Sequence, residues 1–154
     1  MTAAALIAAL RERGLTVAVA ESLTGGLVVA DLVAIPGASA VVRGGVVAYA
    51  TELKAALLGV DAGVLDAGGP IQSIVAEQMA EGVRQRLGAD VGLATTGVAG
   101  PDSQDGHPPG EVWIAVARTG GVDSERVTLT GDRSAIRSQS VDRVLQLALE
   151  LVSE

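Results

Sequence analysis

The stretch Leu15-Thr16-Val17-Ala18-Val19-Ala20-Glu21-Ser22-Leu23-Thr24-Gly25-Gly26 decides the fold of this chain. Its first half is small and apolar with one threonine, which is typical of a strand buried on both faces. Its second half contains hydroxyl side chains and paired glycines, which predict a tight turn that opens a helix over residues 27–34. A buried strand that leads directly into a helix is half of a crossover unit, so the sequence predicts an α/β fold with parallel strands.

The rest of the chain continues this alternation of strands and helices. Further strands are expected over residues 44–50, 90–96, 111–117 and 125–130, and further helices are expected to begin at the N-caps Thr2, Thr51, Ser73 and Asp132. The last two strands flank Gly120-Gly121 and predict a hairpin. We therefore expect one three-layer α/β/α domain over residues 1–154, with a mixed, mostly parallel sheet and an antiparallel hairpin.

Composition excludes several classes of function. The net charge of −7 argues against nucleic-acid binding through a basic face. With no cysteine and one histidine, the chain lacks the ligands of a structural zinc site and cannot form disulfides. Residues 102–106 resemble the start of a calcium loop, but Trp113 stands where the bidentate glutamate belongs, which favours a solvated loop. No apolar run is long enough to span a membrane and no basic residue precedes the apolar N-terminal segment, so we expect a cytoplasmic protein.

Lys54 is the only lysine, and it falls in the first turn of a predicted helix. Leu57 and Leu58 follow at helical spacing, so the lysine stem is expected to lie along the apolar stripe. Burial and the positive end of the helix both disfavour the charged amine, and burial alone lowers a lysine pKa by up to about 3–5 units. A neutral amine can act as a general base. The alternative is a lysine that extends its charge into solvent.

Ser22 is the candidate nucleophile, since it follows a strand at the edge of the sheet where α/β proteins bind ligands. Thr24, Gly25 and Gly26 supply backbone amides that can stabilise an oxyanion. The alternative is that Ser22 or Thr24 only caps the helix. Tyr49 precedes Lys54 by five residues and can polarise the pair or pack on a substrate ring, the alternative being a sheet-edge aromatic.

A serine nucleophile needs a base, and lysine is the known substitute for histidine. The single histidine, His107, lies in a loop rich in proline and glycine with no evident acid to orient it. The sequence therefore predicts a Ser22–Lys54 pair, provided that the two side chains meet at the same edge of the sheet.

Arg133 and Arg137 stand four residues apart at the start of the last helix. Each is disfavoured there by about 0.3–1 kcal/mol through the helix dipole, which predicts a bound anion such as phosphate. The alternative is pairing with Asp132 or another carboxylate. The segment 95–101, which includes Gly97 and Gly100, can cradle a phosphate or hold a ribose with its backbone amides, although it is no Walker loop.

Seven ordered segments carry a family resemblance. They are Ala20-Glu21-Ser22-Leu23-Thr24-Gly25-Gly26, Pro36-Gly37-Ala38-Ser39, Gly44-Gly45-Val46-Val47-Ala48-Tyr49, Lys54-x-x-Leu57-Leu58-Gly59-Val60, Met79-Ala80-x-Gly82, Thr96-Gly97-Val98-Ala99-Gly100-Pro101 and Gly131-Asp132-Arg133-x-x-x-Arg137. In this order, over nearly the whole chain, they resemble the C-terminal domain of the CinA competence/damage-inducible protein family. That family includes nicotinamide-nucleotide amidases, which hydrolyse the carboxamide of nicotinamide mononucleotide to nicotinate mononucleotide and ammonia.

The resemblance implies an amidase of pyridine nucleotide salvage, with Ser22 as nucleophile and Lys54 as base. Tyr49 joins the catalytic set, and the expected substrate-binding residues are Thr24, Gly25, Gly26, Ser39, Gly44, Gly45, Thr96, Gly97, Gly100, Arg133 and Arg137. It also implies a homodimer that uses no metal or cofactor. Many members carry a further N-terminal domain with pyrophosphatase activity, which we do not expect here because the chain begins at the amidase domain.

The chain departs from the family pattern in three places. Leu23 stands where many members have cysteine, His107-Pro108-Pro109-Gly110 replaces Lys-Pro-x-Gly, and the segment 69–73 is looser than Gly-x-Val-Ser. None of these changes touches Ser22 or Lys54. A second function stays open at this point: a nucleotide-binding or interaction module that keeps the fold and the anion pocket but performs no chemistry.

Overall fold

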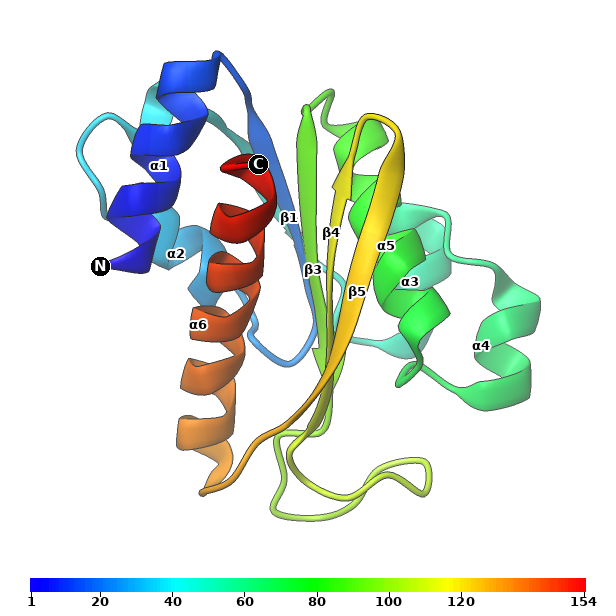
Figure 1. The fold of residues 1–154 in the computed structure, drawn as a ribbon. Helices are drawn as coiled ribbons and strands as arrows, with labels where there is room; N and C mark the ends of the chain where they lie inside the picture. The colour runs from blue at the N-terminus through cyan, green and yellow to red at the C-terminus, as the bar shows by residue number, and fades with distance from the viewer.

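The computed structural model describes residues 1–154 as one five-stranded sheet with helices on both faces (Figure 1). In chain order the elements are α1 (Thr2–Arg13), β1 (Val17–Glu21), α2 (Leu27–Val33), the 3₁₀ helix η1 (Ala38–Ala40), β2 (Val42–Val47), α3 (Thr51–Leu58), α4 (Ala62–Gly68), α5 (Ser73–Arg86), β3 (Val91–Gly97), β4 (Glu111–Arg118), β5 (Gly121–Thr128) and α6 (Arg133–Val152). None of these helices combines the length and the apolar character needed to cross a bilayer.

The sheet confirms the predicted fold class. Its strand order is β2-β1-β3-β4-β5, in which β1 pairs in parallel with β2 and β3, while β4 pairs antiparallel with β3 and β5. Only β4 opposes the direction of the other strands, so the sheet is mixed and mostly parallel, with a hairpin at one edge. In the β3–β4 pair, Thr96 lies directly opposite Trp113. This register places both side chains on the same face of the sheet.

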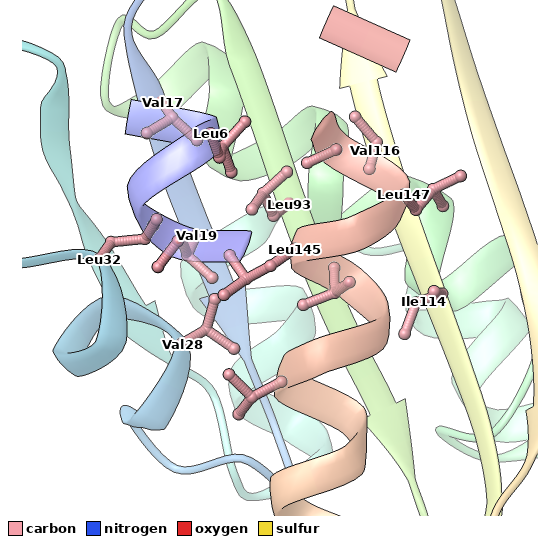
Figure 2. Packing of buried hydrophobic residues seen from close by; sticks show 14 of the residues in the cluster. Leu6, Val17, Val19, Val28, Leu32, Leu93, Ile114, Val116, Leu145 and Leu147 are labelled. Carbon is pink, nitrogen blue, oxygen red and sulfur yellow. The ribbon is translucent and has the colours of Figure 1, made fainter. Parts of the chain in front are cut away.

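Two apolar cores hold the three layers together. Figure 2 shows the larger one, in which side chains of α1, α2 and α6 pack on one face of the sheet; labelled members include Leu6, Val28, Leu93 and Leu145. The second core lies under α3 and α5 and is rich in alanine. A Cβ atom on Gly92 would lie 2.1 Å from the carbonyl oxygen of Ala80, so α5 can approach β3 this closely only because residue 92 is glycine.

Several predicted helix and strand limits were wrong. Asp132 caps α6 as expected, its carboxylate accepting from Ala135 N at 2.9 Å. Thr2, Thr51 and Ser73 are instead the first helical residues, and the N-caps are Met1, Ala50 and Gln72, none of which makes a side-chain cap bond. Those helix starts depend on packing of the apolar faces rather than on a cap.

The structure also has elements that were not expected. Helix α4 is capped by Asp61, whose carboxylate accepts from Gly63 N and Val64 N, and η1 forms before β2. Strand β5 starts at Gly121 rather than at residue 125, because it pairs with β4 along its whole length. Its side chains are mostly polar and exposed, so the apolar alternation that marks a strand is weak there.

Candidate active site

Ser22 directly follows β1, at the C-terminal ends of the parallel strands. Its backbone N–H donates to the carbonyl oxygen of Thr95 at 3.1 Å, which fixes the start of the turn to β3. Gly25 and Gly26 then adopt φ angles of 56° and 107°, which only glycine tolerates readily, and these turn the chain into α2. The serine side chain is therefore presented on a bend between a buried strand and a helix, as predicted from the sequence.

The structure brings Lys54 to Ser22. Lys54 lies on the buried face of α3 together with Leu58, is 1% exposed, and points its amine back towards the end of β1. The Nζ atom lies 2.9 Å from Ser22 Oγ, 2.7 Å from the carbonyl oxygen of Ala48 and 3.2 Å from that of Tyr49. Every hydrogen of an ammonium group would have an acceptor here, which explains how a buried lysine is tolerated.

This environment changes the acidity of the lysine. Burial lowers the pKa of the Lys54 amine from 10.5 to about 8, and the negative charge of Glu52 acts in the opposite direction. When the amine is neutral, its two hydrogens can stay on the carbonyl oxygens of Ala48 and Tyr49, which leaves its lone pair facing the Ser22 hydroxyl. The hydroxyl then donates to Nζ instead of accepting from it, so the geometry suits a general base.

Ser22 and Lys54 open into a cleft of about 390 Å³. Its other walls come from the end of β3, the loop that follows it, and α6; the lining residues include Leu23, Tyr49, Pro70, Thr96, Gly97, Val98, Ala99, Gly100, Pro101 and Arg133. Thr96 Oγ1 donates to the carbonyl oxygen of Pro70 at 2.8 Å. The backbone N–H groups of Leu23, Ala99 and Gly100 donate to no group of the protein, so they are free for a ligand.

Arg133 and Tyr49 lie together at the exposed end of the cleft. Arg133 Nη2 donates to the Tyr49 hydroxyl at 3.1 Å, and Nη1 donates to the carbonyl oxygen of Gly100. The Tyr49 side chain is 60% exposed, and no carboxylate pairs with Arg133. The cleft thus has a cation at its mouth whose charge no carboxylate neutralises, which suits an anionic ligand.

Arg137 does not share this position. It lies one turn further along α6, outside the lining of the cleft, and its Nε donates to the carbonyl oxygen of Leu23 at 2.9 Å while Nη2 donates to that of Thr24 at 3.4 Å. The alternative of a carboxylate partner is wrong for both Arg133 and Arg137. Arg137 instead contacts the back of the turn that carries Ser22.

The amides expected to stabilise an oxyanion are not those of the glycines. Gly25 N donates to the carbonyl oxygen of Ser22 at 3.1 Å, and Gly26 N donates to Glu21 Oε1 at 3.1 Å, so both are already occupied. The Thr24 N–H, like that of Leu23, donates to no group of the protein, whereas the Thr24 side chain is fully buried and its hydroxyl bonds to Thr95 Oγ1 at 2.8 Å. The two glycine amides build the turn, and the free amide directly after the nucleophile belongs to Leu23.

Ser39, Gly44 and Gly45 lie elsewhere in the chain. Ser39 is exposed on η1 and, with Gly44, borders a separate groove of about 460 Å³ between α2 and β2. A Cβ atom on Gly45 would lie 2.4 Å from Val29 Cγ2, so this glycine permits α2 to pack on β2. Within one copy of the chain, these three residues do not line the cleft at Ser22.

His107 does have an acid beside it, contrary to the sequence prediction. Its Nδ1 lies against Glu111 Oε2, and Arg126 Nη2 donates to Glu111 Oε1 at 2.7 Å. The acid was missed because Glu111 belongs to the start of β4, and the loop folds back to meet it. His107 is absent from the lining of the cleft. The structure contains no group of three His, Cys, Asp or Glu side chains able to hold a metal.

Glu21 is a residue whose role the sequence did not reveal. It is fully buried next to Ser22, and its carboxylate accepts from Gly26 N at 3.1 Å, Val28 N at 2.9 Å and Val29 N at 3.1 Å. Those amides are the unpaired donors at the start of α2, so Glu21 joins the end of β1 to the helix. A glutamate as the last residue of a buried strand is the signal that could have identified it.

Replacing Glu21 with glutamine is expected to destabilise the fold by about 1.5–3 kcal/mol, because one amide oxygen cannot accept from all three donors and the NH₂ group faces an N–H. Urea unfolding measures the change. Glu150→Gln, at an exposed position on α6, is the matched control and should change stability by less than about 0.5 kcal/mol. An equal effect of the two substitutions would contradict this role of Glu21.

Comparison with known proteins identifies the family. The model of the CinA C-terminal domain matches residues 1–152. A CinA-like protein from Frankia casuarinae is 51% identical over 142 residues, which cover 92% of this chain and 33% of that protein. A CinA-like protein from Gemmatimonas aurantiaca is 48% identical over 149 residues, which cover 96% of this chain and 34% of that protein. The chain thus spans about a third of the length of these curated relatives.

Solved structures agree with the sequence comparison. A competence-damaged protein (CinA) superfamily protein from Klebsiella pneumoniae has a TM-score of 0.95 at 32% identity, with 99% of this chain and 96% of that chain covered. A competence/damage inducible protein from Agrobacterium tumefaciens has a TM-score of 0.94 at 35% identity, with 99% and 94% covered. The chain therefore belongs to the CinA C-terminal domain family.

Proposed function

We propose that this chain is a nicotinamide-nucleotide amidohydrolase, which converts nicotinamide mononucleotide to nicotinate mononucleotide and ammonia. The observation that carries the proposal is the 2.9 Å contact between Lys54 Nζ and Ser22 Oγ, formed by a lysine that is 1% exposed. Membership of a family that includes amidases supports it.

The first step forms an acyl-enzyme. Neutral Lys54 accepts the hydroxyl proton of Ser22 while Oγ attacks the carboxamide carbon, which gives a tetrahedral intermediate with a negatively charged oxygen. The Leu23 N–H follows the nucleophile directly and is free to donate to that oxygen. Protonated Lys54 then gives its proton to the departing nitrogen, the C–N bond breaks, and ammonia leaves.

The second step reverses the roles. Lys54, neutral again, takes a proton from a water molecule that attacks the ester carbon of the acyl-enzyme. The proton passes to Ser22 Oγ as the C–O bond breaks, which releases the carboxylate product and regenerates the hydroxyl. One base serves both steps because its two carbonyl partners, Ala48 and Tyr49, hold it in place in either protonation state.

The cleft also offers contacts for the phosphate of the substrate. With the carboxamide at Ser22, the phosphate lies towards Arg133, since this arginine lines the cleft and Arg137 does not. The free N–H groups of Ala99 and Gly100 offer further donors on the same wall. A volume of about 390 Å³ falls in the range of small-ligand sites.

Incubation of the purified chain with nicotinamide mononucleotide tests the proposal. We expect ammonia and nicotinate mononucleotide in equal amounts. A coupled assay measures the ammonia, and chromatography measures the mononucleotide. Binding of the mononucleotide without either product would instead favour the non-catalytic nucleotide-binding module. Neither binding nor turnover would contradict both functions.

The rate is expected to depend on pH through Lys54. Because the neutral amine is the active form and the pKa is about 8, kcat/KM should rise about tenfold per pH unit below that value and level off above it. Glu52→Gln removes the charge that raises this pKa, so its profile should shift to lower pH and its rate at pH 6–7 should increase. Initial rates from pH 5.5 to 9.5 measure both profiles.

Glu12→Gln provides the control, since Glu12 is exposed on α1 and does not line the cleft. Its profile should coincide with that of the unchanged chain. A Glu52→Gln profile that stays in place or moves to higher pH would contradict the assignment of the titrating group.

A further inference from the structure

Arg137 contacts the turn of the candidate nucleophile from α6 and does not line the cleft. Its guanidinium donates to the carbonyl oxygens of Leu23 and Thr24, the two residues that follow Ser22. We propose that Arg137 is a positioning residue that orients and polarises the Leu23 N–H, the amide that meets the oxyanion. This inference rests on the proposed amidase function and gives Arg137 a role other than phosphate binding.

A chain of hydrogen bonds connects the guanidinium to that amide. Arg137 Nη2 donates to the carbonyl oxygen of Thr24 at 3.4 Å. The N–H of the same peptide group belongs to Gly25, and it donates to the carbonyl oxygen of Ser22 at 3.1 Å. The N–H of that next peptide group is the free amide of Leu23. Each bond polarises the following peptide group, so the positive charge strengthens the last donor.

A second contact fixes the orientation of the same residue. Arg137 Nε donates to the carbonyl oxygen of Leu23 at 2.9 Å, the shorter of the two bonds. The carbonyl oxygen of Leu23 is thus held towards α6, and Leu23 also lines the cleft. Because Leu23 lies in a turn without strand or helix bonds of its own, this contact replaces the support that a regular element would give.

The charge of Arg137 is committed to these carbonyl oxygens. No carboxylate pairs with it, and its side chain is half-buried against the turn. A Cβ atom on Gly25 would lie 3.3 Å from Arg137 Nη2, which shows how closely the guanidinium fits the backbone. Arg133, four residues earlier on α6, differs because it lines the cleft and reaches the Tyr49 hydroxyl.

The two roles predict different kinetics. If Arg137 positions the amide, Arg137→Gln lowers kcat for nicotinamide mononucleotide by at least about tenfold, but by less than the roughly 10²–10³-fold that follows loss of a whole oxyanion donor. KM and the affinity for nicotinate mononucleotide stay within about twofold. If Arg137 bound phosphate, KM and product affinity would weaken while kcat changed little.

A fluorophosphonate probe makes the test independent of the natural substrate. Ser22 Oγ attacks phosphorus, Lys54 takes the hydroxyl proton and fluoride leaves, while the phosphoryl oxygen occupies the oxyanion position. We expect Arg137→Gln to slow this labelling by the same factor as kcat, with Arg137→Lys recovering part of the rate. Thermal unfolding verifies that each variant is folded at the assay temperature, and a variant that is unfolded there is replaced by Arg137→Lys in the comparison.

Two variants serve as comparisons. Arg133→Gln should raise KM and weaken product affinity, whereas Arg137→Gln should leave both within about twofold. Arg143→Gln should change neither product affinity nor labelling. Arg143 lies further along α6 and pairs with Glu125 on β5. Equal labelling of Arg137→Gln and the unchanged chain would overturn the inference even if turnover proceeds. Labelling of the unchanged chain without ammonia release would refute the proposed substrate alone, and no labelling at all would overturn both proposals.

Discussion

Ser22→Ala is expected to lower turnover of nicotinamide mononucleotide by at least about 10⁴-fold, because no other hydroxyl lies within reach of the buried amine. The fold should survive, since Ser22 is small and its backbone bond to Thr95 does not involve the side chain. Lys54 keeps its contacts with the carbonyl oxygens of Ala48 and Tyr49. Ammonia release measures the loss, and mass spectrometry should find no acyl-enzyme and no fluorophosphonate adduct in the variant.

Ser138→Ala is the matched control, as Ser138 is an exposed serine on α6 outside the cleft. It should retain full turnover and full labelling. Ammonia release by Ser22→Ala at the rate of the unchanged chain would remove the covalent mechanism, and a probe adduct on another residue would identify a different nucleophile.

Lys54→Met is the second large effect, and it separates catalysis from stability. Methionine has a similar length and no basic nitrogen, so turnover should again fall by at least roughly 10⁴-fold. Lys54→Arg should be equally inactive, because a guanidinium stays protonated and cannot act as a base. Activity of either variant near that of the unchanged chain would exclude Lys54 as the base.

Lys54→Met should lower activity but stabilise the fold at neutral pH, and this gain in stability should depend on pH. The folded-state pKa of about 8 lies below the ordinary value of 10.5, so the unfolded chain binds more protons between these values and the unchanged protein becomes more stable as pH rises. Below about pH 8 the burial of a charged amine costs the unchanged protein about 3 kcal/mol, a cost that methionine lacks. The stability of Lys54→Met relative to the unchanged chain should therefore fall by about 2–3 kcal/mol between pH 7 and pH 10.

Urea unfolding at these two pH values measures the difference. Ser22→Ala is the appropriate control, since it keeps the lysine and should follow the unchanged chain in its pH dependence. A constant difference between Lys54→Met and the unchanged chain would show that the lysine pKa is not lowered in the folded state.

The order of strands and helices was predictable because it depends on local patterns. The small apolar run before Glu21 and the glycine turn after it define β1 and α2, and the cap at Asp132 defines the start of α6. Helix α4 was missed, since a short segment with glycines at 63 and 68 has low helix propensity. It forms next to α3 because Asp61 caps it, which is a local effect, and because the chain packs there, which is a tertiary effect.

The meeting of Ser22 and Lys54 could be anticipated, since both follow strands that end at the same edge of the sheet. The partners of the Lys54 amine could not be anticipated. Two of them are backbone carbonyl oxygens, and their direction depends on how the chain leaves β2. The same limit applies to Arg133 and Arg137. Their spacing indicated a shared role, but only the structure shows that Arg133 reaches the cleft while Arg137 binds the back of the turn.

The scarcity of aromatic residues has a practical consequence. Trp113 is the only tryptophan and lies opposite Thr96, whose side chain lines the cleft, while Tyr49, the only tyrosine, stands at its mouth. The residues that give the protein its intrinsic fluorescence therefore both lie close to the cleft. A pyridine ring that enters there should quench the emission, so ligand occupancy can be followed without an attached dye and without background from distant chromophores.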